Sequence, residues 1–264
     1  MKKSLRFIFA TIVAFTSLAA QAQQLQFCGT EVTPGKTYTK SDFSQIKSGS
    51  FKLSSNGNYL EVNNLTVTNG TCIFYFNGSN DVTIKFVGES HFTITANTTG
   101  AFVFSSPSGV RNVLVTGDKA IFENVYNVGG SAFAYGKNCH ITIEDCYVKA
   151  TSGSSNDDYS LVKDINPNVS TTSLVTIKNS TVISNTIYNI KELELLGCNF
   201  VTPKSYAYLA PCNSYGGQRL TANGQNVKGF TIMPVSDMKD GDVNHDGKVN
   251  VSDISALINI ILGL

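Results

Sequence analysis

Short apolar runs alternate with polar positions along most of the chain, and turn residues separate them. From about residue 59 a unit recurs that consists of a short apolar strand, a turn rich in Gly, Asn and Ser, an alternating strand and another short strand. The alternation has the period of two that is typical of half-buried strands. The first strands of successive units are expected to begin near residues 73, 101, 132, 160 and 187.

Units that recur at a step of 27 to 31 residues indicate a repeat architecture. In a solenoid each turn covers the apolar edge of its neighbour. Three short strands per step, with no helix-length segment between them, predict an all-β fold, a right-handed parallel β-helix over 51–235. An N-terminal cap is expected over 23–50, because an uncovered end would leave strand edges unpaired. We also expect Asn80, Asn112 and Asn138, which precede middle strands, to stack on one another.

This repeat region resembles the right-handed β-helix proteins of pectate-lyase-like architecture. More narrowly, it resembles the β-solenoid carbohydrate-binding modules of exported bacterial proteins. A jelly-roll sandwich is the rival all-β arrangement. The Asn-Gly pairs that begin at residues 69, 77 and 223 keep that rival open, because Asn-Gly favours two-residue hairpin turns.

Residues 1–22 have the pattern of a secretory signal peptide. Three basic residues precede an apolar run over 7–20, and the segment ends on Ala20-Gln21-Ala22, a small-x-small cleavage pattern. The run is shorter than the roughly 20 residues that a spanning helix needs, and no later stretch is apolar enough to span a bilayer. We therefore expect a secreted protein that is not membrane-spanning, placed outside the cell, on its surface or in the periplasm.

Charge and cysteine content narrow the range of functions. Charged residues make up 15% of the chain and the formal net charge is +1, which excludes a strongly basic nucleic-acid binder. The chain has six cysteines, and none of their spacings matches a zinc site. An even number in an exported chain permits disulfides, whereas the strand-like positions of several cysteines suit buried thiols. Both interpretations stay open.

Near the C-terminus, residues 242–253 fit the twelve-residue calcium loop position by position. Calcium prefers six to eight oxygen ligands, which such a loop supplies from positions 1, 3, 5, 7, 9 and 12. These positions hold Asp242, Asn244, Asp246, Lys248, Asn250 and Asp253. Gly247 at position 6 permits the sharp turn, Lys248 offers its carbonyl, and Asp253 stands where Glu is more common. The sequence therefore predicts a Ca²⁺ site, and we expect folding of the tail to depend on the ion.

An apolar stripe follows the loop directly and predicts a helix over 253–264. Its members recur at helical spacing and are Ile254, Leu257, Ile258, Ile261 and Leu262. A loop that opens with Gly-Asp-Val-Asn and is followed only by its exit helix resembles the type I dockerin repeat, over residues 241–264. The resemblance implies a docking module over 236–264 and a cohesin-like partner, because dockerins attach exported, often polysaccharide-degrading proteins to cohesin-bearing scaffolds.

Two features depart from the dockerin pattern. A dockerin carries two such repeats, and this chain holds one. The family also recognises its partner through loop positions 10 and 11 and a basic residue on the helix, whereas here those positions are Val251 and Ser252 and the helix has no Lys or Arg. A helix of this length is marginal alone. Its stripe must therefore bury against the end of the β-helix, a second copy of the chain or another protein.

No catalytic residue is assigned from the sequence. Lyases and galacturonases on β-helices cluster carboxylates with Arg, Lys or His, but the adjacent acidic pair Asp157-Asp158 is expected in a turn. His91 and His140 are expected to be structural strand residues. We therefore predict a non-catalytic exported protein that acts at polysaccharide surfaces. The alternatives are a polysaccharide lyase or glycoside hydrolase of the β-helix class, and an extracellular adhesin or spacer.

Tyrosines are the candidate platforms for sugar rings. The candidates are Tyr126, Tyr135, Tyr147, Tyr159, Tyr206, Tyr208 and Tyr215. Each could equally pack in the core, so a tyrosine that binds a polysaccharide must be exposed on a face of the solenoid.

Overall fold

The structure is a computed structural model. It describes residues 24–262 except 71, 96–99, 106–109, 126–129, 137, 153–158, 165–172, 204–206, 213, 215, 236–240, 242, 244–248 and 250. For residues 159, 164 and 260–262 it describes the backbone alone.

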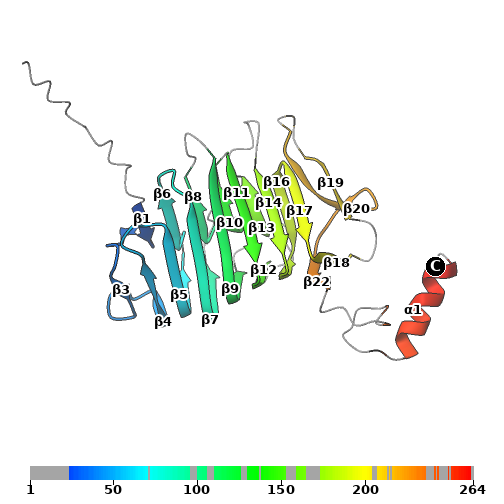
Figure 1. The fold of residues 1–264 in the computed structure, drawn as a ribbon, viewed down its shortest axis with the longest axis horizontal. Helices are drawn as coiled ribbons and strands as arrows, with labels where there is room; N and C mark the ends of the chain where they lie inside the picture. The colour runs from blue at the N-terminus through cyan, green and yellow to red at the C-terminus, as the bar shows by residue number, and fades with distance from the viewer. Residues whose placement is uncertain are drawn as a thin grey trace, which may run out of the picture.

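The chain coils into a β-solenoid of about four turns (Figure 1). The first of its three faces consists of one parallel strand from each turn, in chain order along the coil. These strands are β6 (Phe74–Asn77), β8 (Phe102–Phe104), β10 (Gly130–Tyr135), β13 (Tyr159–Asp164) and β16 (Thr186–Ile190). Each begins within two residues of the position that the repeat predicts, so the predicted first strands are confirmed.

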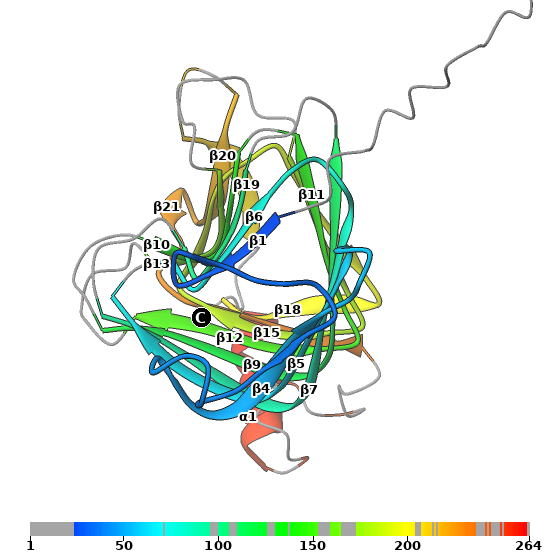
Figure 2. The ribbon, with the colours of Figure 1, turned by 90° about the vertical axis from the view of Figure 1, so that its left-hand side faces the viewer.

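The second and third faces begin as long strands that bend from one face into the other. These are β5 (Tyr59–Asn69), β7 (Val82–Ile94) and β9 (Arg111–Asn124). Beyond β9 the faces separate. The second continues through β11 (Cys139–Glu144), β14 (Leu174–Lys178) and β17 (Glu192–Leu196), and the third through β12 (Tyr147–Ser152) and β15 (Thr181–Ser184). Figure 2 views the coil from its N-terminal end.

Antiparallel strands lie at both ends of the coil. At the N-terminal end these are β1 (Gln24–Phe27), β2 (Thr30–Glu31), β3 (Thr37–Tyr38) and β4 (Ile46–Leu53). At the C-terminal end they are β18 (Cys198–Thr202), β19 (Ala207–Pro211), β20 (Gln218–Ala222), β21 (Gln225–Asn226) and β22 (Phe230–Pro234). The helix α1 (Val251–Leu262) follows.

Parallel pairing between successive turns excludes the jelly-roll sandwich. Of the three Asn-Gly pairs, Asn223-Gly224 alone forms a hairpin turn, between β20 and β21, and both residues have positive φ. The pairs at 69 and 77 follow the ends of β5 and β6 instead. An Asn-Gly pair therefore marks the end of a strand in this chain, but it does not by itself predict a hairpin.

Phenylalanines fill the interior in columns that run along the coil. Phe74 stacks on Phe102 at a ring-centroid distance of 4.8 Å, and Phe92 stacks on Phe122 at 4.9 Å. These distances match the spacing of about 4.8 Å between neighbouring strands, because parallel register places equivalent residues of successive turns directly above one another. All four side chains are buried.

The bend between the second and third faces needs left-handed backbone in every turn. The residues with positive φ at this bend are Asn64, Gly88, Gly117, Asp145, Asn179 and Gly197. At this bend an asparagine of one turn lies against a glycine of the next. A Cβ on Gly88 would lie 2.1 Å from Asn64 Oδ1, and the same oxygen accepts the Glu89 N–H at 3.2 Å. The asparagine side chain therefore occupies the space that glycine leaves.

The predicted stack of Asn80, Asn112 and Asn138 is wrong. The backbone N–H and Nδ2 of Asn112 donate to the Asp81 carboxylate at 2.8 and 3.2 Å. On its other side Asn112 is in register with His140. The three asparagines therefore occupy different register positions, and side chains can stack only where register aligns them.

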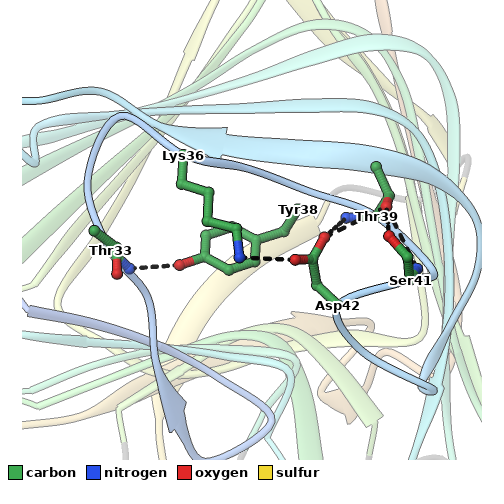
Figure 3. A network of polar contacts seen from close by, with 6 residues as sticks. All are labelled: Thr33, Lys36, Tyr38, Thr39, Ser41 and Asp42. Carbon is green, nitrogen blue, oxygen red and sulfur yellow. Dashed lines mark hydrogen bonds and ion pairs between the residues drawn. The ribbon is translucent and has the colours of Figure 1, made fainter.

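A polar network fixes the turn before β4 at the N-terminal end (Figure 3). Lys36 Nζ lies 2.7 Å from Asp42 Oδ1 and 4.6 Å from the centroid of the Tyr38 ring. The Tyr38 hydroxyl accepts the Thr33 N–H at 2.7 Å, and Asp42 Oδ2 accepts the Thr39 N–H at 2.9 Å. The Lys36 hydrogen bond, followed by that from Thr39, lowers the pKa of Asp42.

Candidate calcium-binding loop and docking helix

The predicted calcium loop is described only in part. Asp242, Asn244, Asp246, Lys248 and Asn250 lie outside the described residues, as does Gly247. The described part comprises Gly241, Val243, Val249 and the start of α1, which includes Asp253 at loop position 12. The fit of the segment to a calcium ion is therefore tested at its two ends.

Asp253 is the side chain in α1 that withdraws from solvent. Only 3% of its surface is exposed, whereas the adjacent Ser252 and Ile254 are exposed. A carboxylate lies fully buried only where it is paired, hydrogen-bonded or bound to a metal. Its position in the first turn also places a negative charge at the positive end of the helix dipole. This burial fits the role that loop position 12 has in closing a calcium site.

The other end of the loop turns back on itself. Gly241, directly before position 1, has a φ of +90°, which favours glycine. A Cβ at this position would lie 3.2 Å from Val249 Cγ1, so loop position 8 packs close to the residue that directly precedes the loop. Residues 241 and 249 are therefore close in space, which fits a loop that surrounds an ion.

The apolar stripe of α1 is exposed. Ile254, Leu257 and Ile258 are 59%, 46% and 48% exposed. Figure 1 shows α1 apart from the strands of the solenoid, beyond β22 and β18. The described part of the stripe therefore does not bury against the end of the β-helix, which was one of the three expected arrangements. The side chains of Ile261 and Leu262 lie outside the described residues.

The exposed apolar surface is wider than the sequence predicted. Val251, at 75%, and Val249, at 58%, are also exposed, and α1 begins at Val251, two residues before the predicted start. Both valines lie between predicted calcium ligands in the sequence, so the helical spacing that predicted the stripe did not include them. The described side chains of α1 include no basic group, so this surface is apolar and nearly uncharged.

The candidate tyrosines that the structure describes lie partly in the core and partly on the surface. Tyr135 is fully buried in β10, so of the two interpretations given for each tyrosine, packing in the core holds for this one. Tyr208 in β19 is 45% exposed, and Tyr147 in β12 is partly exposed with Lys119 Nζ 5.1 Å from its ring centroid. The side chains of Tyr126, Tyr159, Tyr206 and Tyr215 lie outside the described residues.

Charged residues on the described strands form ion pairs between turns. Lys119 Nζ lies 2.9 Å from Glu89, which also accepts from His91, and Lys178 Nζ lies 2.5 Å from Glu144. Asp157 and Asp158 lie outside the described residues. Within the described ranges no three His, Cys, Asp or Glu side chains form a group that could hold a metal. No described helix has the length and apolar character of a membrane span.

No protein-family model, curated protein or solved structure matches the chain.

Proposed function

We propose that this chain is an exported, non-catalytic β-helix protein that attaches to a partner through a calcium-organised C-terminal helix. The exposed stripe of Ile254, Leu257 and Ile258 carries the proposal. A soluble chain rarely leaves aligned aliphatic side chains on one helix face uncovered, unless that face is a binding surface.

The partner that this surface fits is a protein with an uncharged apolar face, such as a cohesin-like module. Two observations support that choice. The helix has no basic residue with which to bind an anionic surface, and the buried Asp253 removes its described acidic group from the contact. The exposed aliphatic side chains are four on α1 and Val249, which precedes the helix. Such side chains are those through which a helix binds an apolar groove.

Calcium would organise the tail before it binds. The oxygens of Asp242, Asn244, Asp246, Asn250 and Asp253, with the Lys248 carbonyl, are the donors that would hold it. Bound calcium supplies a fixed charge that holds these oxygens together. Because Asp253 lies in the first turn of α1, its fixation also fixes the start of the helix and the orientation of the stripe.

Calcium titration by calorimetry tests the metal site. We expect one calcium ion per chain, and a large loss of affinity in Asp242→Ala and Asp253→Asn. His245→Ala is the matched control, because loop position 4 is not a ligand position and its affinity should stay unchanged. Absence of heat at millimolar calcium would refute the site.

Binding to immobilised cohesin-like modules, measured with calcium and with a chelator, tests the partner. Leu257→Glu and Ile258→Glu place charge in the stripe and should abolish binding, whereas Asn259→Glu, at an exposed polar position away from the stripe on the same helix, should retain it. Calcium-dependent dimerisation in light scattering, lost in Leu257→Glu, would assign the stripe to a second copy and overturn the proposed partner. Equal binding by Leu257→Glu would remove the stripe from the contact.

We further propose that the solenoid faces a polysaccharide. Tyr147 and Tyr208 support this, because an exposed ring can stack on a sugar. On a glycan array, Tyr147→Ala and Tyr208→Ala should each weaken binding relative to the parent chain. Release of oligosaccharide from the bound glycan would instead favour the lyase or hydrolase, and no binding at all would favour the adhesin or spacer.

A further inference from the structure

Two cysteines lie at the same end of the strand pair that joins the N-terminal strands to the first turn. Cys28 directly follows β1, and Cys72 lies two residues before the start of β6. β1 and β6 are antiparallel with Phe27 opposite Phe74, and the Cys28 N–H donates to the Ile73 carbonyl at 2.8 Å. The residue opposite Cys28 is therefore the chain neighbour of Cys72.

Both thiols are partly buried. Loss of water raises the pKa of each to about 12, and a charge on Cys28 further raises the pKa of Cys72. Cys72 Sγ lies 3.1 Å from the Phe74 carbonyl and 3.8 Å from the Ala101 carbonyl, on the side of β6 that faces β8, so its side chain has to rotate toward β1 for a bond to form.

Other pairings are disfavoured by register. Cys146 and Cys198 lie on either side of Ser180, whose hydroxyl accepts the Cys146 N–H at 3.2 Å and whose N–H lies 3.2 Å from Cys198 Sγ. Cys139 is in register with Arg111. Disulfides need Cα atoms within about 7 Å, which a residue on an intervening turn prevents.

We propose that Cys28 and Cys72 form a disulfide that links the N-terminal strand β1 to the first turn of the solenoid. The structure has both as thiols. Cys28 and Gly29 form the tight turn between β1 and β2, and nothing lies within 4 Å of a Cβ placed on Gly29, so this turn has room to adjust as the bond forms.

Oxidised glutathione, or another disulfide of the same class, serves as the oxidant. The Cys28 thiolate attacks one of its sulfurs and releases one glutathione thiolate, and the Cys72 thiolate then attacks Cys28 Sγ and releases the second. Two protein thiols are oxidised, one glutathione disulfide is reduced, and two protons pass to the glutathione thiolates. Because both cysteine pKa values are raised, the uncatalysed reaction should be slow at neutral pH and faster at higher pH.

Peptide mapping of the full chain tests the link. The purified protein is incubated in glutathione redox buffer at alkaline pH, alkylated without reduction and digested with trypsin. We expect a cross-linked pair that contains residues up to Lys36 and residues 53–85, each with one cysteine. The Cys212→Ser control should retain this pair, and Cys28→Ser and Cys72→Ser should each lose it.

Thermal unfolding gives a second measurement. The oxidised parent should unfold at a higher temperature than its reduced form, whereas Cys72→Ser should show no difference between the two conditions. Alkylation of both Cys28 and Cys72 after oxidation, glutathione that persists on both, or a cross-link to another cysteine would overturn the proposal.

Discussion

The solenoid and the C-terminal tail bury apolar surface in opposite ways. In the solenoid each turn covers the next, so that Phe102 is fully buried between Phe74 and Phe133. In the tail, Leu257 and Ile258 lie on the surface of a single helix of twelve residues. Apolar side chains thus stabilise the solenoid by packing against each other. The described apolar side chains of the tail have no such packing and are available to contact another molecule.

This difference assigns the two regions different sources of stability. The solenoid gains its free energy of folding from repeated contacts between neighbouring turns. An isolated helix of about twelve residues is marginal in water. We therefore expect the tail to depend on calcium and on its partner, and changes in the solenoid core to leave calcium binding by the tail unchanged.

The largest expected effect is in the phenylalanine column. Phe102→Ala removes a ring that stacks 4.8 Å from Phe74 and should lower the free energy of unfolding by about 3–5 kcal/mol in urea denaturation. Phe102→Leu, which retains more volume, should cost less. Calcium affinity of the folded variant should equal that of the parent. A change in calcium affinity would show that the two regions are coupled.

A glycine at the bend should have the next largest effect. A Cβ on Gly117 would lie 2.0 Å from the Phe86 carbonyl oxygen, at a φ of +102°. Gly117→Ala should therefore cost more than about 2 kcal/mol in unfolding free energy. Gly29→Ala is the control, because its φ of +82° is similar and nothing lies near its Cβ, so it isolates backbone strain from the clash. Equal costs would refute the clash.

One buried charge interrupts the apolar interior. Arg111 is fully buried, its Nη1 lies 3.4 Å from the Phe76 carbonyl, and Nε and Nη2 have no hydrogen-bond partner among the described residues. Burial lowers the pKa of its guanidinium. Because such a group costs free energy to desolvate, Arg111→Met should stabilise the chain by about 1–2 kcal/mol, measured by urea denaturation.

Arg111→Lys is the matched comparison, since it retains a buried charge and should not stabilise. A loss of stability in Arg111→Met would show that the guanidinium makes a necessary interaction. If calcium organises the tail as we propose, none of these variants should alter the helix content that it induces there.

The repeat in the sequence was sufficient to predict the solenoid. Strand positions from β6 to β16 follow from apolar runs at a regular step, because equivalent positions in each turn face the same interior. The Asn-Gly packing at the bend was not predictable, since Asn64 contacts the segment around Gly88 only through register between turns. Sequence spacing alone places asparagines near turns without giving that register.

In the tail, the sequence predicted the secondary structure but not the surroundings of the side chains. Periodicity predicted its helix and stripe, but not whether the stripe is covered, because exposure depends on where the rest of the chain lies. The sequence left the position of Tyr135 open between core and surface for the same reason. All six residues of β10 are buried, so alternation gives no outward face there. The neighbours of Cys28 likewise depend on the pairing of β1 with β6, which joins segments distant in sequence.

The smallest expected effect concerns surface ion pairs of the solenoid and its N-terminal end. Lys36 lowers the pKa of Asp42, and Lys119, followed by His91, lowers the pKa of Glu89. A carboxyl group with a lowered pKa in the folded state stabilises the fold above its unfolded pKa, which is 3.8 for Asp42 and 4.5 for Glu89, and this contribution is lost as the pH falls through the folded value. The melting temperature should therefore fall slightly below about pH 4.5.

The variants Lys36→Gln and Lys119→Gln should flatten this pH dependence. Lys40→Gln should leave it intact, because it changes the charge equally and Lys40 makes no ion pair with the described residues. Both pairs are largely exposed, so each shift should be smaller than that of any core substitution and should shrink in high salt. Carboxylates bind calcium only when they are deprotonated, so acid should also release calcium from the proposed site and unfold the tail while the solenoid stays folded. Separate transitions for the two regions would support their independence, and a single transition would contradict it.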